Sequence, residues 1–206
     1  MGDERMEKIT VYSGDCFPLR PDREEVFRWL QCSAEQPCYG AFAAVWDRAV
    51  ALLSETAEPR AAALREAEDR LSILLTLGQR PEEAATRLFY KQDYITGSIL
   101  NVLCDELLFQ MDGLAFKLLK RDLARERLSV SAREEPGIDY PIEDQQSCLA
   151  QLRPVFPGVS ISEHGIISPA KSMMYRVMLS HRDCGHVSLH DCSVCPQTDC
   201  LYRHVK

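Results

Sequence analysis

A long amphipathic segment is the sequence feature that most restricts how this chain can fold. From Thr96 onward, apolar residues recur at spacings of four and three, which is the period of one helix face. The main stripe consists of Ile99, Leu103, Leu107, Met111, Leu114 and Leu118, and it is widened by Leu100, Cys104, Leu108 and Leu119. We expect a helix buried on a broad face, with Asp112-Gly113 as the place where it would bend. The stripe is interpreted as core and not as a cofactor-binding segment.

Shorter patterns on both sides of this helix predict the remaining elements. Pro21 and Pro81 are each followed by acidic residues, as at helix starts, and further helices are expected over 40–54 and 142–152. Strands are expected over 9–13, 71–77, 128–133, 159–162 and 174–179. The sum is a helix-rich single α+β domain with a small, mainly antiparallel sheet and a Cys-rich C-terminal tail. We divide it into an N-terminal helical part (1–60), an α+β core (61–180) and the tail (181–206).

Charge and motif content exclude several classes of function. The 206 residues include 24 Lys and Arg against 31 Asp and Glu, a net charge of −7 that disfavours binding to nucleic acid. No stretch approaches the roughly 18 apolar residues of a membrane span. Residues 1–5 lack the basic-then-apolar order of a secretion signal, so we expect a cytoplasmic protein. The motifs of conventional hydrolases, kinases and dehydrogenases are missing.

The cysteines gather at the C-terminus and suggest a metal site. The chain has nine cysteines, an odd number that disfavours a disulfide framework. The four candidate metal ligands are Cys184, Cys192, Cys195 and Cys200, with His181, His186, His190 and His204 as possible substitutes for one thiolate. Four thiolates suit either zinc or an iron–sulfur cluster, and spacing alone does not choose between them. The alternatives are free thiols or a redox dithiol at Cys192 and Cys195, although the usual strand–CxxC–helix context is missing.

An arginine followed by a Gly/Pro loop is a second candidate site. Arg133 ends a predicted strand, and the loop that follows contains Pro136 and Gly137. An arginine in this position can make a two-pronged contact with a carboxylate, and a glycine lets a ligand approach the backbone closely. The alternative is an ordinary surface ion pair between Arg133 and Glu134 or Glu135.

Five short motifs follow one another in the second half of the chain: Arg133-x-x-Pro136-Gly137, Asp139-Tyr140-Pro141-Ile142-Glu143, Ile161-Ser162-Glu163, Pro169-Ala170-Lys171-Ser172 and Ser180-His181. In this order and approximate spacing they resemble the reactivation domain of cobalamin-dependent methionine synthase. Upstream, Leu75-Thr76-Leu77-Gly78 is similar to the family's Thr-x-Gly strand end. Short stand-alone members end in C-x2-C-x4-C-x-x-Arg, which Cys192, Cys195, Cys200 and Arg203 match. The resemblance covers roughly residues 60–203.

This resemblance implies a function in cobalamin chemistry. Such a domain binds S-adenosylmethionine and docks on the corrinoid-binding domain of a methyltransferase. One electron from a low-potential donor and a methyl group from S-adenosylmethionine then convert cob(II)alamin to methylcobalamin. A stand-alone chain would do this in trans. The alternatives are a non-catalytic module that docks on the corrinoid protein, and a metal-binding or iron–sulfur redox protein unrelated to cobalamin.

The resemblance also implies roles for particular residues. Arg133 would grip the carboxylate of S-adenosylmethionine, and Glu135 would present its backbone to the ligand in the loop that contains Gly137. The family's Tyr after this glycine is Ile138 here. The aromatic pair that precedes Ser-His in the large enzymes is replaced, and Tyr175 is the candidate substitute.

Two further expectations concern the long helix and the tail. The family's acidic ligand residue on the long helix falls near Phe109. An iron–sulfur cluster in the tail would deliver the electron to cobalt, whereas a zinc ion would only hold the tail in place.

Overall fold

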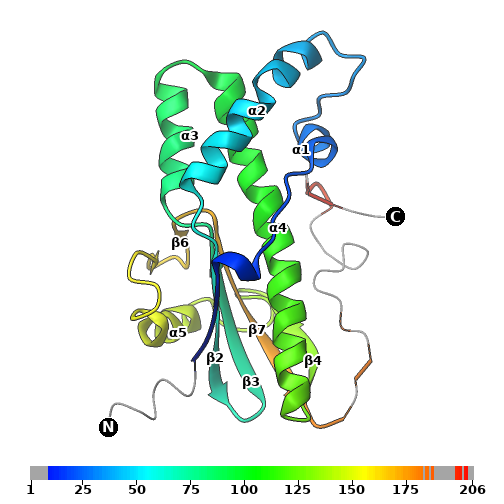
Figure 1. The fold of residues 1–206 in the computed structure, drawn as a ribbon. Helices are drawn as coiled ribbons and strands as arrows, with labels where there is room; N and C mark the ends of the chain where they lie inside the picture. Colours follow the sequence, from blue (N-terminus) through cyan, green and yellow to red (C-terminus); the bar gives the residue numbers. More distant parts are fainter. Residues whose placement is uncertain (1–8, 183, 186, 188–197, 201, 204–206) are drawn as a thin grey trace.

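The computed structural model describes residues 9–182, 184–185, 187, 198–200 and 202–203, and these form an α+β fold (Figure 1). The elements in chain order are β1 (Ile9–Ser13), a 3-10 turn η1 (Gly14–Cys16), α1 (Arg23–Trp29), α2 (Tyr39–Thr56), β2 (Arg60–Ala67), β3 (Arg70–Thr76), α3 (Arg80–Tyr90), α4 (Tyr94–Arg125), β4 (Ser129–Glu134), α5 (Asp144–Leu152), β5 (Ser160–Ile161), β6 (Ile167–Ser168) and β7 (Ser172–Ser180). The expected fold class is confirmed. The division at residues 60 and 180 stays a prediction.

The sheet has the strand order β1-β2-β3-β7-β4 in the described part of the chain, and every neighbouring pair is antiparallel. Strand β2 has no counterpart among the expected elements. Four of its eight residues are alanine, a residue type with a low intrinsic preference for strands. It forms a strand because it pairs with β1 on one edge and β3 on the other, while Ala62 and Leu64 are buried.

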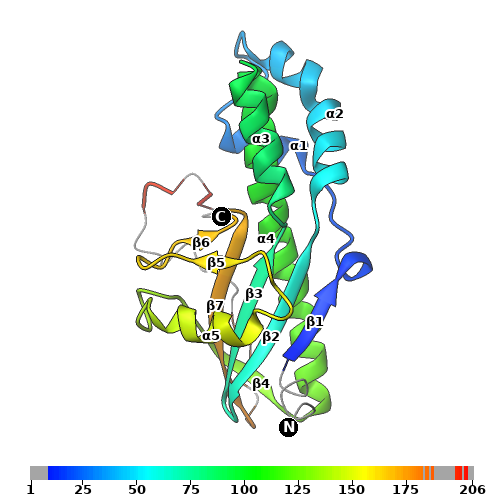
Figure 2. The same ribbon diagram turned by 90° about the vertical axis from the view of Figure 1, so that its left-hand side faces the viewer.

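Helix α4 is the longest element and connects the two halves of the fold. It starts behind Asp93, whose carboxylate accepts a hydrogen bond from the Thr96 amide at 3.4 Å, and continues as one helix through Asp112-Gly113. Its first half packs against α1, α2 and α3, and its second half lies on the sheet (Figures 1 and 2). No helix in the described part of the chain combines the length and the apolar run that a membrane span requires.

The sheet separates two hydrophobic layers. Figure 2 shows α4 on one side of the sheet and α5 with β5 and β6 on the other. The α4 side contains the predicted stripe, whose members Ile99, Leu103 and Met111 are fully buried. Each such side chain contributes roughly 1.5–3 kcal/mol by its removal from water. Neighbours along β7 alternate between the layers, because successive strand residues point to opposite faces.

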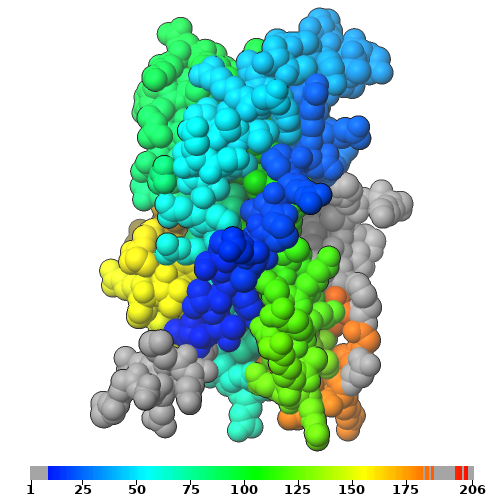
Figure 3. Space-filling view, in the orientation of Figure 1, coloured from blue at the N-terminus to red at the C-terminus, as the bar shows by residue number. Residues whose placement is uncertain are grey.

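The N-terminal strand completes the surface between α2 and the second half of α4 (Figure 3). Tyr12 of β1 donates a hydrogen bond to Asp122 Oδ2 on α4 at 2.9 Å. Burial raises the pKa of the Tyr12 hydroxyl, and the Asp122 carboxylate raises it further. The tyrosine is therefore a neutral donor that ties the edge of the sheet to the long helix.

Candidate functional site

Arg133 lies at the meeting point of β4, β7 and α4. It is paired in register with Val177, and its side chain lies on the α4 side of the sheet with only 8% of its surface exposed. Its Nη1 donates to Asp112 Oδ2 and its Nε donates to Glu135 Oε1, both at 2.6 Å. The guanidinium carbon stands 3.6 Å from the ring centroid of Tyr175, and Nη2 is 3.5 Å from Met173 Sδ.

The electrostatics of this cluster keep the arginine charged and the tyrosine neutral. Burial alone would lower the pKa of Arg133, but Asp112, Tyr175 and Glu135 outweigh that effect and raise it. Burial, followed by the nearby Asp112, raises the pKa of Tyr175 well above its ordinary value. Asp112 Oδ1 and the Tyr175 hydroxyl are buried beside each other, and neither has a hydrogen bond of good geometry to a described residue. An unused acceptor and an unused hydroxyl therefore lie beside a cationic group.

The loop after Arg133 is held by its own hydrogen bonds. The Glu135 amide donates to Asp139 Oδ2 at 2.8 Å, and the Gly137 amide donates to the Tyr140 carbonyl at 2.8 Å. Gly137 has φ +76°, a left-handed conformation in which glycine is favoured. Ile138 projects from the loop with 72% of its surface exposed. The loop thus carries Glu135 and Gly137 on a fixed backbone beside Arg133.

The far end of the loop is attached to the opposite face of the sheet. The ring of Tyr140 stacks under Arg176, whose guanidinium carbon is 4.1 Å from the ring centroid. Arg176 also forms ion pairs with Asp144 at 3.0 Å and with Glu66 at 3.1 Å. Tyr175 and Arg176 are adjacent in β7 and point to opposite faces. Each therefore joins a different arginine–tyrosine stack.

The structure brings together three of the four candidate ligand-binding residues and adds one that sequence reasoning missed. Arg133 contacts both Glu135 and Tyr175, and Gly137 lies in the same loop as Glu135. The acidic residue of the long helix that reaches Arg133 is Asp112, not a residue at position 109; Phe109 packs against Trp29 instead. The available signal for Asp112 was a carboxylate inside an apolar helical stripe, which needs a buried cationic partner.

The candidate metal ligands are only partly described. Cys192 and Cys195 lie outside the described residues. Cys184 is exposed and its thiol contacts the Arg182 carbonyl at 3.3 Å, while Cys200 is half-buried. Among the residues that the structure describes, no group of three His, Cys, Asp or Glu side chains could hold a metal ion.

A described part of the tail is anchored on the helices by an aromatic contact. The Tyr202 ring centroid is 4.6 Å from that of Trp29 and 5.4 Å from that of Phe109. The Tyr202 hydroxyl donates to Asp105 Oδ2 at 2.8 Å, and Asp105 also pairs with Lys171 at 2.7 Å. Cys200 lies two residues before Tyr202 in the chain.

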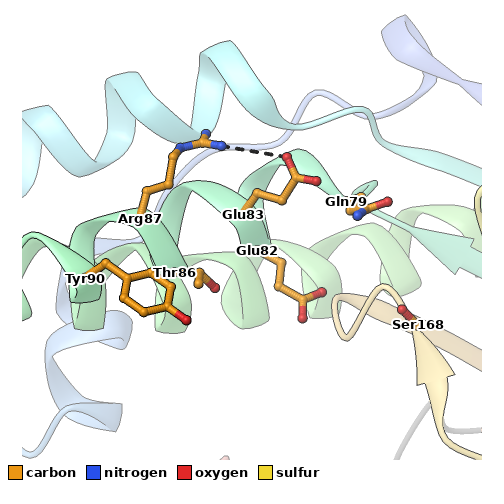
Figure 4. Close-up of a pocket in the computed structure, with 7 residues that line it drawn as sticks. All are labelled: Gln79, Glu82, Glu83, Thr86, Arg87, Tyr90 and Ser168. Carbon is orange, nitrogen blue, oxygen red and sulfur yellow. Dashed lines mark ion pairs between the residues drawn. The ribbon is translucent and has the colours of Figure 1, made fainter.

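A separate open pocket of about 320 Å³ runs along α3 (Figure 4). Its lining residues are Gln79, Glu82, Glu83, Thr86, Arg87, Tyr90 and Ser168. Glu83 and Arg87 form an exposed ion pair at 3.7 Å, and Glu82 accepts a hydrogen bond from the Ala170 amide at 2.9 Å. The pocket contains none of the residues that the sequence suggested for a site, and its charged groups already have partners.

Comparison with known proteins adds one structural likeness. No described protein family matches the chain, and no curated protein matches it. Among solved structures it is similar to a crystal structure of the MetH reactivation domain bound to AdoHcy, with a TM-score of 0.60 and 13% sequence identity. The match covers 88% of this chain and 81% of the other. The resemblance seen in the sequence is therefore confirmed at the level of structure, and this chain has the fold of the MetH reactivation domain.

Proposed function

We propose that this protein binds S-adenosylmethionine at the Arg133 site and reactivates the cobalamin of a partner methyltransferase in trans. The observation that carries this proposal is the fold likeness to a reactivation domain bound to AdoHcy, since AdoHcy is what remains after S-adenosylmethionine gives up its methyl group. Arg133, the arginine of the Arg-x-x-Pro-Gly motif that suggested the same ligand from the sequence, is buried at the start of this loop.

The charges around Arg133 suit the amino-acid end of such a ligand, which carries a carboxylate and an ammonium group. Arg133 would bind the carboxylate. Glu135 has 32% of its side chain exposed and lies at the rim, so its carboxylate is the partner that a ligand carboxylate would replace on Nε. The free oxygen of Asp112 would then accept from the ammonium group, and the Tyr175 hydroxyl is a second unused partner.

The contribution of this chain to the reaction would be positioning. The corrinoid of the partner supplies the cobalt nucleophile, and a low-potential donor supplies the electron. The Gly137 loop would set the distance between the bound methyl donor and the docked partner. An iron–sulfur cluster or zinc ion in the tail stays a prediction.

Isothermal titration with S-adenosylmethionine and AdoHcy tests the binding step. The informative variant is Arg133→Met combined with Asp112→Asn, which removes the cation without leaving a buried charge. Arg87→Met, at an exposed arginine on α3, is the matched control. We expect at least a tenfold loss of affinity in the double variant and none in the control. Equal affinities in a folded double variant would remove Arg133 from the site.

The reactivation step needs its own assay. Cob(II)alamin bound to a corrinoid domain, with S-adenosylmethionine and a chemical reductant, should give the absorption spectrum of methylcobalamin only when this chain is added. Exposed Ile138, at the family's tyrosine position, favours one second candidate, a module that docks on the corrinoid protein without binding the methyl donor. That alternative predicts a stable complex and no heat of binding with S-adenosylmethionine.

A further inference from the structure

Two cysteines outside the candidate site lie side by side in the connection between α1 and α2. The Sγ atoms of Cys32 and Cys38 are 3.9 Å apart. Cys32 is buried, with 5% of its surface exposed, whereas Cys38 is exposed at the residue before α2. No other pair of thiols is in contact among the described residues.

Hydrogen bonds in this connection hold the two thiols together. Gln31 takes a left-handed conformation with φ +52°, which turns the chain at the end of α1. The Cys32 amide then donates to the Phe27 carbonyl at 2.8 Å. The Gln36 amide donates to the Ser33 carbonyl at 3.0 Å, and the Gln36 side chain accepts from the Ser33 amide at 2.9 Å. These hydrogen bonds close the turn between α1 and α2, and the turn keeps the two sulfur atoms near each other.

We propose that Cys32 and Cys38 are a dithiol that is oxidised reversibly by a small-molecule disulfide of the glutathione type. The Cys38 thiolate attacks one sulfur of that disulfide, which forms a mixed disulfide and releases one small thiolate. The Cys32 thiolate then attacks the Cys38 sulfur, which closes the protein disulfide and releases the second small thiolate. The two protons of the protein thiols end on the two released thiols, so two electrons pass from the protein to the small disulfide.

The surroundings explain the order of these steps and the choice of this pair. A disulfide bond is about 2.05 Å long, so the sulfurs need to close by about 1.9 Å, which is within reach of side-chain rotation. Burial raises the pKa of the Cys32 thiol, which leaves exposed Cys38 as the point of entry. Cys104 and Cys148 are buried, and burial raises the pKa of each thiol to about 12, so both are unreactive.

The position of the pair connects it to the tail. Trp29, the last residue of α1, lies three residues before Cys32 and holds the Tyr202 ring. A bond between Cys32 and Cys38 would fix the end of α1 to the beginning of α2. The oxidised form would thus constrain the helix end on which the C-terminal segment is anchored.

Peptide mapping of the full chain tests the proposal. Trypsin releases residues 29–48, which contain both cysteines, and cleavage after Glu35 separates them. After treatment with oxidised glutathione, alkylation of free thiols and both digestions, we expect fragments 29–35 and 36–48 to remain joined, lighter by two hydrogen atoms than their sum. Reduction should separate them.

Two variants provide the controls. Cys16→Ser, which removes an exposed thiol elsewhere, should leave the joined fragments unchanged. Cys38→Ser should abolish them and leave Cys32 alkylated after unfolding. The proposal is wrong if wild-type Cys32 and Cys38 are both recovered alkylated, if Cys38 stops at the mixed disulfide, or if Cys32 is joined to a different cysteine.

Discussion

Replacing Arg133 by methionine is expected to cost a large part of the stability of the fold. The change keeps an unbranched apolar stem but leaves the Asp112 carboxylate without its cation. The Arg133 and Asp112 side chains are 8% and 7% exposed, so solvent does little to compensate. Removing one partner of a buried ion pair costs about 3–5 kcal/mol. In a domain of this size that corresponds to a fall in Tm of roughly 6–20 °C.

Urea unfolding and calorimetry at neutral pH measure this cost directly. We expect Arg133→Met to be the least stable variant and Asp112→Asn to lose less, because Arg133 keeps Glu135 as a partner. The double variant should recover most of the loss, and the resulting cycle gives the coupling energy of the pair. A loss below about 1 kcal/mol in Arg133→Met, with no recovery in the double variant, would refute the buried pair. It would mean that the arginine reaches water in solution.

Three further predictions address other parts of the molecule. Gly165→Ala should lower the urea midpoint of unfolding more than Gly137→Ala does. Both glycines have positive φ, so both substitutions strain the backbone, but the added Cβ meets different space. At position 165 it would lie 2.3 Å from Ile142 Cγ1, whereas at position 137 it would lie 3.8 Å from Ile142 Cδ1. Equal midpoints for the two variants would show that the positive φ, and not the contact with Ile142, sets the loss of stability. Burial raises the pKa of Glu106 in the folded protein above its ordinary value of 4.5. The folded state therefore favours the protonated carboxyl, and this contribution to stability is present at low pH and is lost as the pH rises through the folded-state pKa. Glu106→Gln should therefore be more stable than wild type at neutral pH and lose this advantage in acid, and a pH-independent difference in urea midpoint would contradict the assignment. Iron with acid-labile sulfide, or zinc, should copurify with the anaerobically prepared chain and be lost from Cys192→Ser/Cys195→Ser, and wild-type protein free of all three would overturn the metal prediction.

The sequence indicates the elements whose patterns are local. The helix around Leu103 follows from a stripe that repeats over several turns, and the strand that contains Ile73 follows from a short apolar run before a glycine. Strand β2 could not be found in this way, because its alanines form a strand only between two neighbours. A local pattern reports only the intrinsic preference of a segment for helix or strand. The strand conformation of β2 depends instead on its pairing with β1 and β3 in the sheet.

The same limit applies to the candidate site. The loop after Arg133 is visible as a motif, and Tyr175 follows from the family resemblance, as the substitute for the aromatic pair before Ser-His. In the sequence Asp112 indicates only a bend beside Gly113, because its pairing with Arg133 depends on how α4 is rotated over the sheet. The contact of Tyr202 with Trp29 joins residues from the two ends of the chain, and no local pattern indicates it.

The two arginine–tyrosine stacks have a mechanical consequence for the loop between them. The loop starts at Arg133 on the α4 face and ends at Tyr140 on the α5 face, so it wraps around the edge of the sheet with both ends fastened. A ligand that displaced Glu135 would pull on Tyr140 and, through Arg176, on Asp144 at the start of α5. The loop thereby couples the two faces of the sheet mechanically. Ligand binding at Arg133 on one face would change the rate of amide hydrogen exchange at the start of α5 on the other.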